Sequence, residues 1–134
     1  MRHVLITIDG DESRAELQAQ TVLDLFGTGD ITAHLCHVFV DNPEGASITQ
    51  LPSVRRATAR LEADGVDVQY HGRTGEPVTE IVESAHELDA DVVCVAGRKR
   101  SPTGKLVFGS VTQDVILNTD RPVLVCGTSD ILQG

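Results

Sequence analysis

Residues 97–110, GRKRSPTGKLVFGS, combine glycine with positive charge in a way that suits an anionic ligand. The segment holds both lysines of the chain and two of its nine arginines, and it contains no acid. Gly97, Gly104 and Gly109 let the backbone turn tightly and approach a ligand closely. A helix that opens at Gly109 and Ser110 would offer free N–H groups and a partial positive charge, and the Ser110 hydroxyl could cap that helix or reach a phosphate oxygen. The pattern predicts a phosphate site. The alternative is that the segment binds no ligand. In that case its glycines only end a strand and cap a helix, and its basic residues pair with nearby acids.

Other motifs that would assign a chemistry are absent from the sequence. A P-loop needs GxxxxGK followed by Ser or Thr, but here six residues separate Gly97 from Gly104, and Leu106 follows Lys105. The dinucleotide fingerprint GxGxxG would follow the first strand, where the chain reads DGDESR. The chain contains no GxSxG, and its five histidines show no metal-binding spacing such as HExxH. We therefore expect no catalytic residue and no metal bound by the protein alone.

Hydrophobic periodicity predicts the elements that must position the glycine segment. Short apolar runs predict strands over 3–9, 31–40, 66–72, 91–97 and 121–127, and helical spacing predicts helices over 12–27, 53–65, 75–90 and 110–118. This alternation indicates an α/β fold, a single doubly wound domain over 1–134 with helices on both faces of the sheet. The sheet is expected to hold five parallel strands, because strands covered on both faces read as continuous runs of Val, Ile and Leu. The order that we infer for these strands is 3-2-1-4-5.

Ligands of such sheets bind outside the carboxyl ends of the strands, where the strand order reverses. This rule selects the ends of the first, second and fourth strands, at Asp9, at residues 38–41 and from Gly97 onward. The Asp9 carboxylate could hold a ribose hydroxyl or the magnesium ion of a Mg-nucleotide. Alternatively, Asp9 only begins a turn with Gly10.

Composition restricts the class of partner. The net charge of −9, from 20 acids against 11 bases, argues against a nucleic-acid binder, which needs a basic face. The protein is rich in Asp and has only two lysines, which predicts a halophilic protein, with a mildly acidic mesophilic protein as the alternative. No apolar run approaches the roughly 18 residues of a membrane span, and the start of the chain does not read as a signal peptide, so we expect a cytoplasmic protein. Cys36, Cys94 and Cys126 each lie in an apolar stretch and are expected to be buried reduced thiols.

Three stretches together resemble the universal stress protein family: VLITIDGDES near the start, CHVFV in the second strand, and VAGRKRSPTGKLVFGSVTQDVILNTDRPVLV near the end. The resemblance covers nearly the whole chain. ATP-binding members carry a Gly, a second Gly three residues on, and a Gly-Ser or Gly-Thr pair after nine more residues. Gly97, Gly109 and Ser110 match this motif. Arg100 stands at the second Gly, where its side chain would either crowd the phosphates or bind them, and the loop is one residue shorter.

The resemblance implies a site for ATP or another adenine nucleotide, possibly with Mg. Twelve residues would form it: Thr7, Ile8, Asp9, Val38, Ala96, Gly97, Arg98, Arg100, Gly109, Ser110, Val111 and Thr112. The first four would hold the base and the nucleoside, and Ala96 and Gly97 would bracket the ribose and the α-phosphate. The residues from Gly109 to Thr112 would hold the outer phosphates, with the two arginines adding positive charge.

The resemblance also implies a homodimer that pairs through the last strand, at Val123, Leu124, Val125 and Cys126, and an apolar sheet edge invites such pairing. A regulatory nucleotide-binding module with an unknown protein partner, and not an enzyme, is the function we expect. One alternative is a nucleotide-free interaction protein, which Arg100 and the shorter loop favour. The other is a slow ATPase, for which Asp9 and Asp114 are the only nearby candidates.

Overall fold

The computed structural model describes residues 1–97, 99–100, 106–107 and 109–126, with the two short segments described by their backbone. The elements in chain order are β1 (Arg2–Thr7), α1 (Glu12–Phe26), β2 (Ile31–Phe39), the 3-10 turn η1 (Ile48–Gln50), α2 (Pro52–Ala63), β3 (Asp67–Thr74), α3 (Pro77–Glu87), β4 (Val92–Ala96), β5 (Lys99–Arg100), β6 (Leu106–Val107), α4 (Ser110–Asn118) and β7 (Val123–Cys126). Every strand and helix expected from periodicity is present within a few residues of its predicted ends. The glycine segment was expected to be a loop, but it also contains two short strands, β5 and β6, which form an antiparallel pair.

The main sheet has five strands in the order β3-β2-β1-β4-β7, and every pair in it is parallel. This is the predicted doubly wound order, with β7 as the fifth strand. Val4 lies opposite Ala33 on one side and opposite Val92 on the other. The strand order therefore reverses between β1 and β4. From β1 the chain adds β2 and then β3 on one side, and it then crosses back to add β4 and β7 on the other side.

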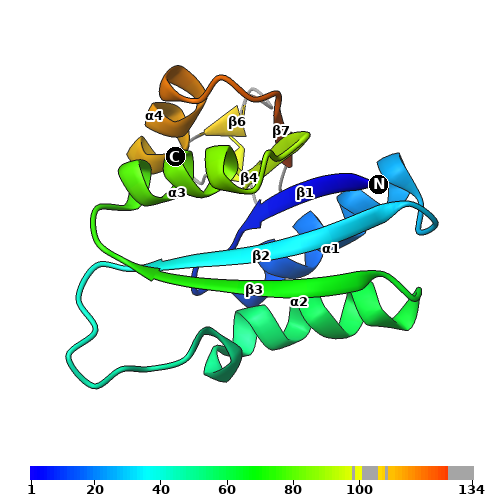
Figure 1. Cartoon of the computed structure of the whole chain (residues 1–134), viewed down its shortest axis with the longest axis horizontal. Helices are drawn as coiled ribbons and strands as arrows, with labels where there is room; N and C mark the ends of the chain where they lie inside the picture. Colours follow the sequence, from blue (N-terminus) through cyan, green and yellow to red (C-terminus); the bar gives the residue numbers. More distant parts are fainter. Residues whose placement is uncertain (98, 101–105, 108, 127–134) are drawn as a thin grey trace.

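Helices cover both faces of this sheet (Figure 1). Val4 and Ile6 point to the face covered by α1 and α2, where they join a core that includes Ala19 and Val54. Leu5 points to the opposite face, into a smaller core with Ala85 on α3 and Val115 on α4. Alternate residues of β1 thus enter different cores, which explains its unbroken apolar sequence. Within the described residues, every helix is too short or too polar to cross a membrane.

The helices all begin at the edge of the sheet where the strands end. The Asp11 carboxylate caps α1 by accepting from the Arg14 amide at 2.9 Å, and Pro77 occupies the first position of α3, where a missing N–H costs nothing. Ser53 at the start of α2 donates its hydroxyl hydrogen bond to the Asp9 carbonyl at 2.6 Å. Gly109, and not Ser110, is the N-cap of α4, and no side chain caps that helix. The capping role considered for Ser110 is therefore wrong, since Ser110 is the first helical residue.

Candidate functional site

A crevice of about 210 Å³ opens at the carboxyl ends of β1, β2 and β4, between α3 and α4. Its lining residues are Thr7, Ile8, Asp9, Cys36, His37, Val38, Pro77, Ile81, Ala96, Gly109, Val111 and Thr112. It lies at the reversal of strand order, where open α/β sheets bind their ligands. Eight of the twelve residues expected at a nucleotide site are among those that line it.

The β1 wall of the crevice ends in a carboxylate that already has partners. The Thr7 hydroxyl donates to the Cys94 carbonyl at 3.2 Å, which ties the end of β1 to β4. One oxygen of Asp9 accepts from the Asp11 amide at 2.8 Å, and the other lies 3.0 Å from the Arg14 guanidinium. Asp9 therefore organises the turn into α1, as one of the two interpretations supposed. Its side chain is still 48% exposed, so it remains accessible from the crevice.

The β2 wall contributes Cys36 and His37 beside the expected Val38. His37 donates from Nδ1 to the Ile8 carbonyl at 2.7 Å, and its ring meets Phe39 edge-on. Burial raises the pKa of the Cys36 thiol to about 11, so this sulfur stays protonated. Neither Cys36 nor His37 was predicted at the site, although their place at the carboxyl end of a predicted strand was a usable signal.

The β4 and α4 walls meet at the start of α4. The Thr112 hydroxyl donates to the Ala96 carbonyl at 3.3 Å, which fixes the helix start beside the strand end. The Gln113 amide makes the first helical hydrogen bond, to Gly109 at 3.1 Å. The three amides before it, from Ser110 to Thr112, have no partner within the helix because helical geometry provides none. Together with the helix dipole they give this end of the crevice a positive partial charge.

The fourth wall comes from α3, through Pro77 and Ile81, which the sequence analysis also missed. The sequence indicated the position of these two residues only indirectly. Because α3 follows β3 closely, its first two turns must lie at the same edge of the sheet, but only the packing of α3 against β2 turns Ile81 toward the crevice.

Gly97 and Ser110, which were also expected at the site, are not among the residues that line the crevice. Gly97 is buried, and its amide already donates to the Cys126 carbonyl at 2.9 Å, so this N–H is not available for a phosphate. Ser110 is exposed in the first turn of α4. Arg98 lies outside the described residues, and only the backbone of Arg100 is described. Asp114, a candidate for activating water, lines a separate hollow with residues of α3.

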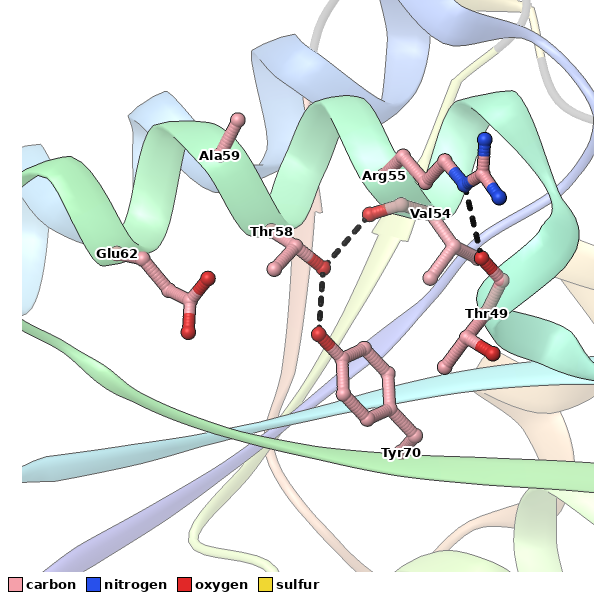
Figure 2. A pocket seen from close by; sticks show the side chains of 7 residues that line it. All are labelled: Thr49, Val54, Arg55, Thr58, Ala59, Glu62 and Tyr70. Carbon is pink, nitrogen blue, oxygen red and sulfur yellow. Dashed lines mark hydrogen bonds between the residues drawn. The ribbon is translucent and has the colours of Figure 1, made fainter.

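A second hollow lies between α2 and β3, and Figure 2 shows the hydrogen bonds that Tyr70, Thr58 and Arg55 make there with one another or with the backbone. The Tyr70 hydroxyl donates to the Thr58 hydroxyl at 3.2 Å, and Arg55 donates to the Thr49 carbonyl at 3.0 Å. Unlike the crevice, it lies away from the carboxyl ends of the strands. We therefore assign the candidate site to the crevice and use this hollow as a control region.

In the described part of the chain, no three His, Cys, Asp or Glu side chains form a group that could hold a metal ion. In the crevice, Asp9 is the one carboxylate in the lining, and its oxygens already bind an amide and a guanidinium. A cation at this site would therefore need most of its ligands from a bound molecule.

Comparison with known proteins gives consistent matches. The model of a family described as the universal stress protein family matches residues 1–127. The stress response protein NhaX of Bacillus subtilis is 28% identical over 97 residues, which are 72% of this chain and 54% of that protein. The chain thus spans about half the length of the curated relatives it matches.

Solved structures extend the match to the fold. A universal stress protein from Archaeoglobus fulgidus is 29% identical, with a TM-score of 0.70 over 94% of this chain and 98% of that one. A universal stress protein from the same organism, solved in complex with dAMP, is 23% identical with a TM-score of 0.68 over 94% of this chain and 98% of that one. At that identity the second structure shows the fold alone.

Proposed function

Because the chain belongs to the universal stress protein family, we propose that it is a regulatory module that binds ATP or another adenine nucleotide in the crevice at the ends of β1, β2 and β4. The observation that carries this proposal is the crevice itself. Apolar side chains from β1 and β2 meet the amide-rich start of α4 within one cavity. The dAMP complex of the Archaeoglobus fulgidus protein supports the choice of an adenine nucleotide.

The walls of the crevice divide the proposed ligand into two parts. Ile8 and Val38 offer apolar surface to a base, and Asp9 offers a carboxylate to a ribose hydroxyl. The cavity is smaller than the roughly 300–1,000 Å³ of a typical ligand pocket, so a base and its sugar would fill it. The phosphates would then lie against the first amides of α4, from Ser110 to Thr112, with Mg brought by the nucleotide.

Binding without rapid hydrolysis is the proposal that fits these residues. A water molecule needs a positioned base or a metal to be activated for attack. Asp9 is occupied by Arg14 and the Asp11 amide, and Asp114 lies in another hollow. A nucleotide that favours one conformation of the protein would suffice for regulation of a protein partner.

One observation favours the alternative of a nucleotide-free interaction protein. The Gly97 amide, expected beside the α-phosphate, is bonded to the Cys126 carbonyl. A nucleotide would therefore have to bind without this N–H. A titration with adenine nucleotides distinguishes the two functions.

The test is a calorimetric titration with Mg-ATP, ADP, AMP and cAMP in high KCl, after any nucleotide that co-purifies has been identified and removed. Ala96→Leu places a larger side chain in the crevice, and we expect it to weaken binding by at least about tenfold, the equivalent of about 1.4 kcal/mol. Ala59→Leu is the matched control, since Ala59 lines the hollow between α2 and β3. We expect it to bind like the unchanged protein.

Absence of heat with all four nucleotides in folded, stripped protein would contradict the proposal and favour the interaction protein. Equal weakening by both leucine variants would place the site elsewhere. Phosphate release above a boiled control, lost in Asp9→Ala, would instead indicate hydrolysis.

Two further properties belong to this proposal. We propose that two copies pair through β7, and that the protein works in a cytoplasm of high salt concentration. The first rests on the place of β7 at the edge of the sheet, and the second on the net charge of −9.

A further inference from the structure

Cys94 and Cys126, which lie 32 positions apart in the sequence, bring their sulfur atoms to within 3.1 Å of each other. Cys94 lies on β4 and Cys126 on the neighbouring β7, where Cys94 is opposite Leu124 and Ala96 is opposite Cys126. The cysteines are thus diagonal neighbours on one face of the sheet, in the core beneath α1. A disulfide requires sulfurs about 2.05 Å apart and Cα atoms about 4.4–6.8 Å apart. Diagonal Cα pairs in a sheet are about 7–8 Å apart, so joining these two sulfurs needs an approach of about 1 Å between them and a movement of β7 toward β4.

The third cysteine provides an internal comparison. Cys36 is also buried and free, but it belongs to the core on the opposite face of the sheet. Cys94 and Cys126 are distinguished by their contact with each other and not by burial, since all three are at most 1% exposed. The hydrogen bond between the thiols lowers the pKa of Cys126 and, with burial, raises the pKa of Cys94. Cys126 is therefore the sulfur that ionises first, while Cys94 keeps its proton.

We propose that Cys94 and Cys126 are a redox-active pair that hydrogen peroxide converts to an intramolecular disulfide. The Cys126 thiolate attacks one peroxide oxygen, the O–O bond breaks, and a sulfenic acid forms with release of hydroxide. The Cys94 sulfur then attacks the sulfenic sulfur, which forms the S–S bond and expels the oxygen as water. In balance, two thiols and one peroxide give one disulfide and two waters. The sulfurs are oxidised and the peroxide oxygens are reduced.

The bond would close a loop that contains the glycine segment. Residues 94–126 include the end of β4, all of residues 97–110 and the whole of α4. Ala96 lines the crevice two residues after Cys94, and the Gly97 amide is bonded to the Cys126 carbonyl. Oxidation would therefore fix β7 against β4 beside the crevice. The chemistry of the pair does not depend on whether the crevice binds a nucleotide.

Burial determines how fast the reaction can be. Cys94 is 0% exposed and Cys126 is 1% exposed, so the oxidant must be small and the sheet must open locally. β7 has only β4 beside it among the described strands, and edge strands open more readily than central ones. We therefore expect slow oxidation of the folded protein, limited by the opening of β7.

The first experiment uses the reduced full-length protein and hydrogen peroxide. Thiols are counted in denaturant before and after treatment, and we expect three to fall to one, with a loss of about 2 Da in intact mass for the two hydrogens. Trypsin cuts after Arg98 and Lys105 and so separates the two cysteines. A peptide pair that contains Cys94 and Cys126, and separates on reduction, identifies the bond.

Variants and stability complete the test. We expect Cys36→Ala to lose both remaining thiols, and Cys94→Ala or Cys126→Ala to form no intramolecular disulfide. In the unchanged protein the disulfide should raise the midpoint of thermal unfolding by on the order of 10 °C, because it closes a long loop in the unfolded chain. The rise should vanish on reduction.

Three results would overturn the proposal: three thiols that survive peroxide in the folded protein, a disulfide that includes Cys36, or oxidation to sulfinic acid at separate cysteines with a gain in mass. Each can be read from the unchanged protein, so the conclusion does not depend on the folding of a variant.

Discussion

Three histidines from three strands form a row on the face of the sheet that α3 and α4 cover. Nδ1 of His3 and Nε2 of His34 are 2.9 Å apart, and Nδ1 of His34 and Nε2 of His71 are also 2.9 Å apart. A neutral imidazole has one donor and one acceptor, so the uncharged row satisfies both bonds, and a single extra proton on His34 also satisfies them. A second proton would place two N–H groups face to face and break a bond.

At this residue scale we expect a specific loss of stability in mild acid. Burial, followed by the charges of His71 and His3, lowers the pKa of His34 from 6.5 to about 4. The unfolded chain therefore binds more protons than the folded protein between those values, and the free energy of unfolding falls as the pH falls from 6.5 toward 4. His34 should account for up to about 2 kcal/mol between pH 7 and pH 5, measured by urea unfolding.

Neighbouring groups modify this titration but do not reverse it. Burial, followed by the charge of Arg73, lowers the pKa of His71. Asp67 acts in the opposite direction on the pKa of His34, and Glu87 does so on that of His71. His34→Gln should flatten the dependence between pH 7 and pH 5, while His86→Gln, at an exposed position on α3, should leave it unchanged. Parallel curves for the unchanged protein and His34→Gln would refute the assignment.

At the level of single elements, β7 is the strand through which we propose that two copies pair. Among the described strands, β7 forms one edge of the sheet. The carbonyls of Pro122, just before β7, and of Cys126, its last residue, point to β4 and accept from the Val93 and Gly97 amides at 2.9 Å. Because successive residues of a strand alternate in direction, Val123 and Val125 direct their backbone groups away from β4. These groups are what a second copy would pair with.

This geometry suggests a substitution that blocks pairing and spares the sheet. Val125→Pro removes an outward N–H, which an edge strand tolerates, whereas Val125→Thr keeps both the N–H and the branched shape. By light scattering in high KCl, we expect twice the 14.4 kDa chain mass for the unchanged protein and Val125→Thr, and a single chain mass for Val125→Pro. A monomeric unchanged protein, or a dimer that survives the proline, would show that β7 is not the interface.

At the scale of the whole molecule, negative charge is the dominant surface property. Several arginines already lie against carboxylates: Arg73 is 3.0 Å from Glu80 and 2.8 Å from Glu87, and Arg14 contacts Asp9. These pairs do not offset the net charge of −9, whose self-repulsion opposes the compact state. Salt screens such repulsion, since the screening length falls from about 10 Å at 0.1 M to about 3 Å at 1 M.

We therefore expect the midpoint of thermal unfolding to rise with KCl, most steeply below about 1 M, when followed by far-UV circular dichroism. Sucrose at equal osmolality is the control, because it favours burial without screening charge. A protein that is fully folded and equally stable in dilute buffer and in KCl would contradict the halophilic interpretation.

The elements, their order along the chain and the edge of the sheet that carries the candidate site could all be predicted from the sequence. Hydrophobic periods of two and 3.6 residues depend only on residues close together in the sequence. The apolar run from Val4 to Ile8 and the capping of α1 by Asp11 could therefore be recognised without knowledge of the fold. The ends of β1, β2 and β4 could be assigned to one edge because parallel strands must end together. That argument supplied Asp9 and Val38, and the resemblance to the universal stress protein family supplied Thr7 and Ala96; all four lie around one crevice.

Which distant side chains meet depends on how the strands are assembled in three dimensions. The Cys94–Cys126 contact, the row of His3, His34 and His71, and the bond from the Gly97 amide to Cys126 all depend on the lateral order and register of strands. A shift of one residue in register would send each side chain to the other face, and no local pattern encodes that choice. Register is set by the packing of both cores at once, so these contacts became visible only when the sheet was assembled.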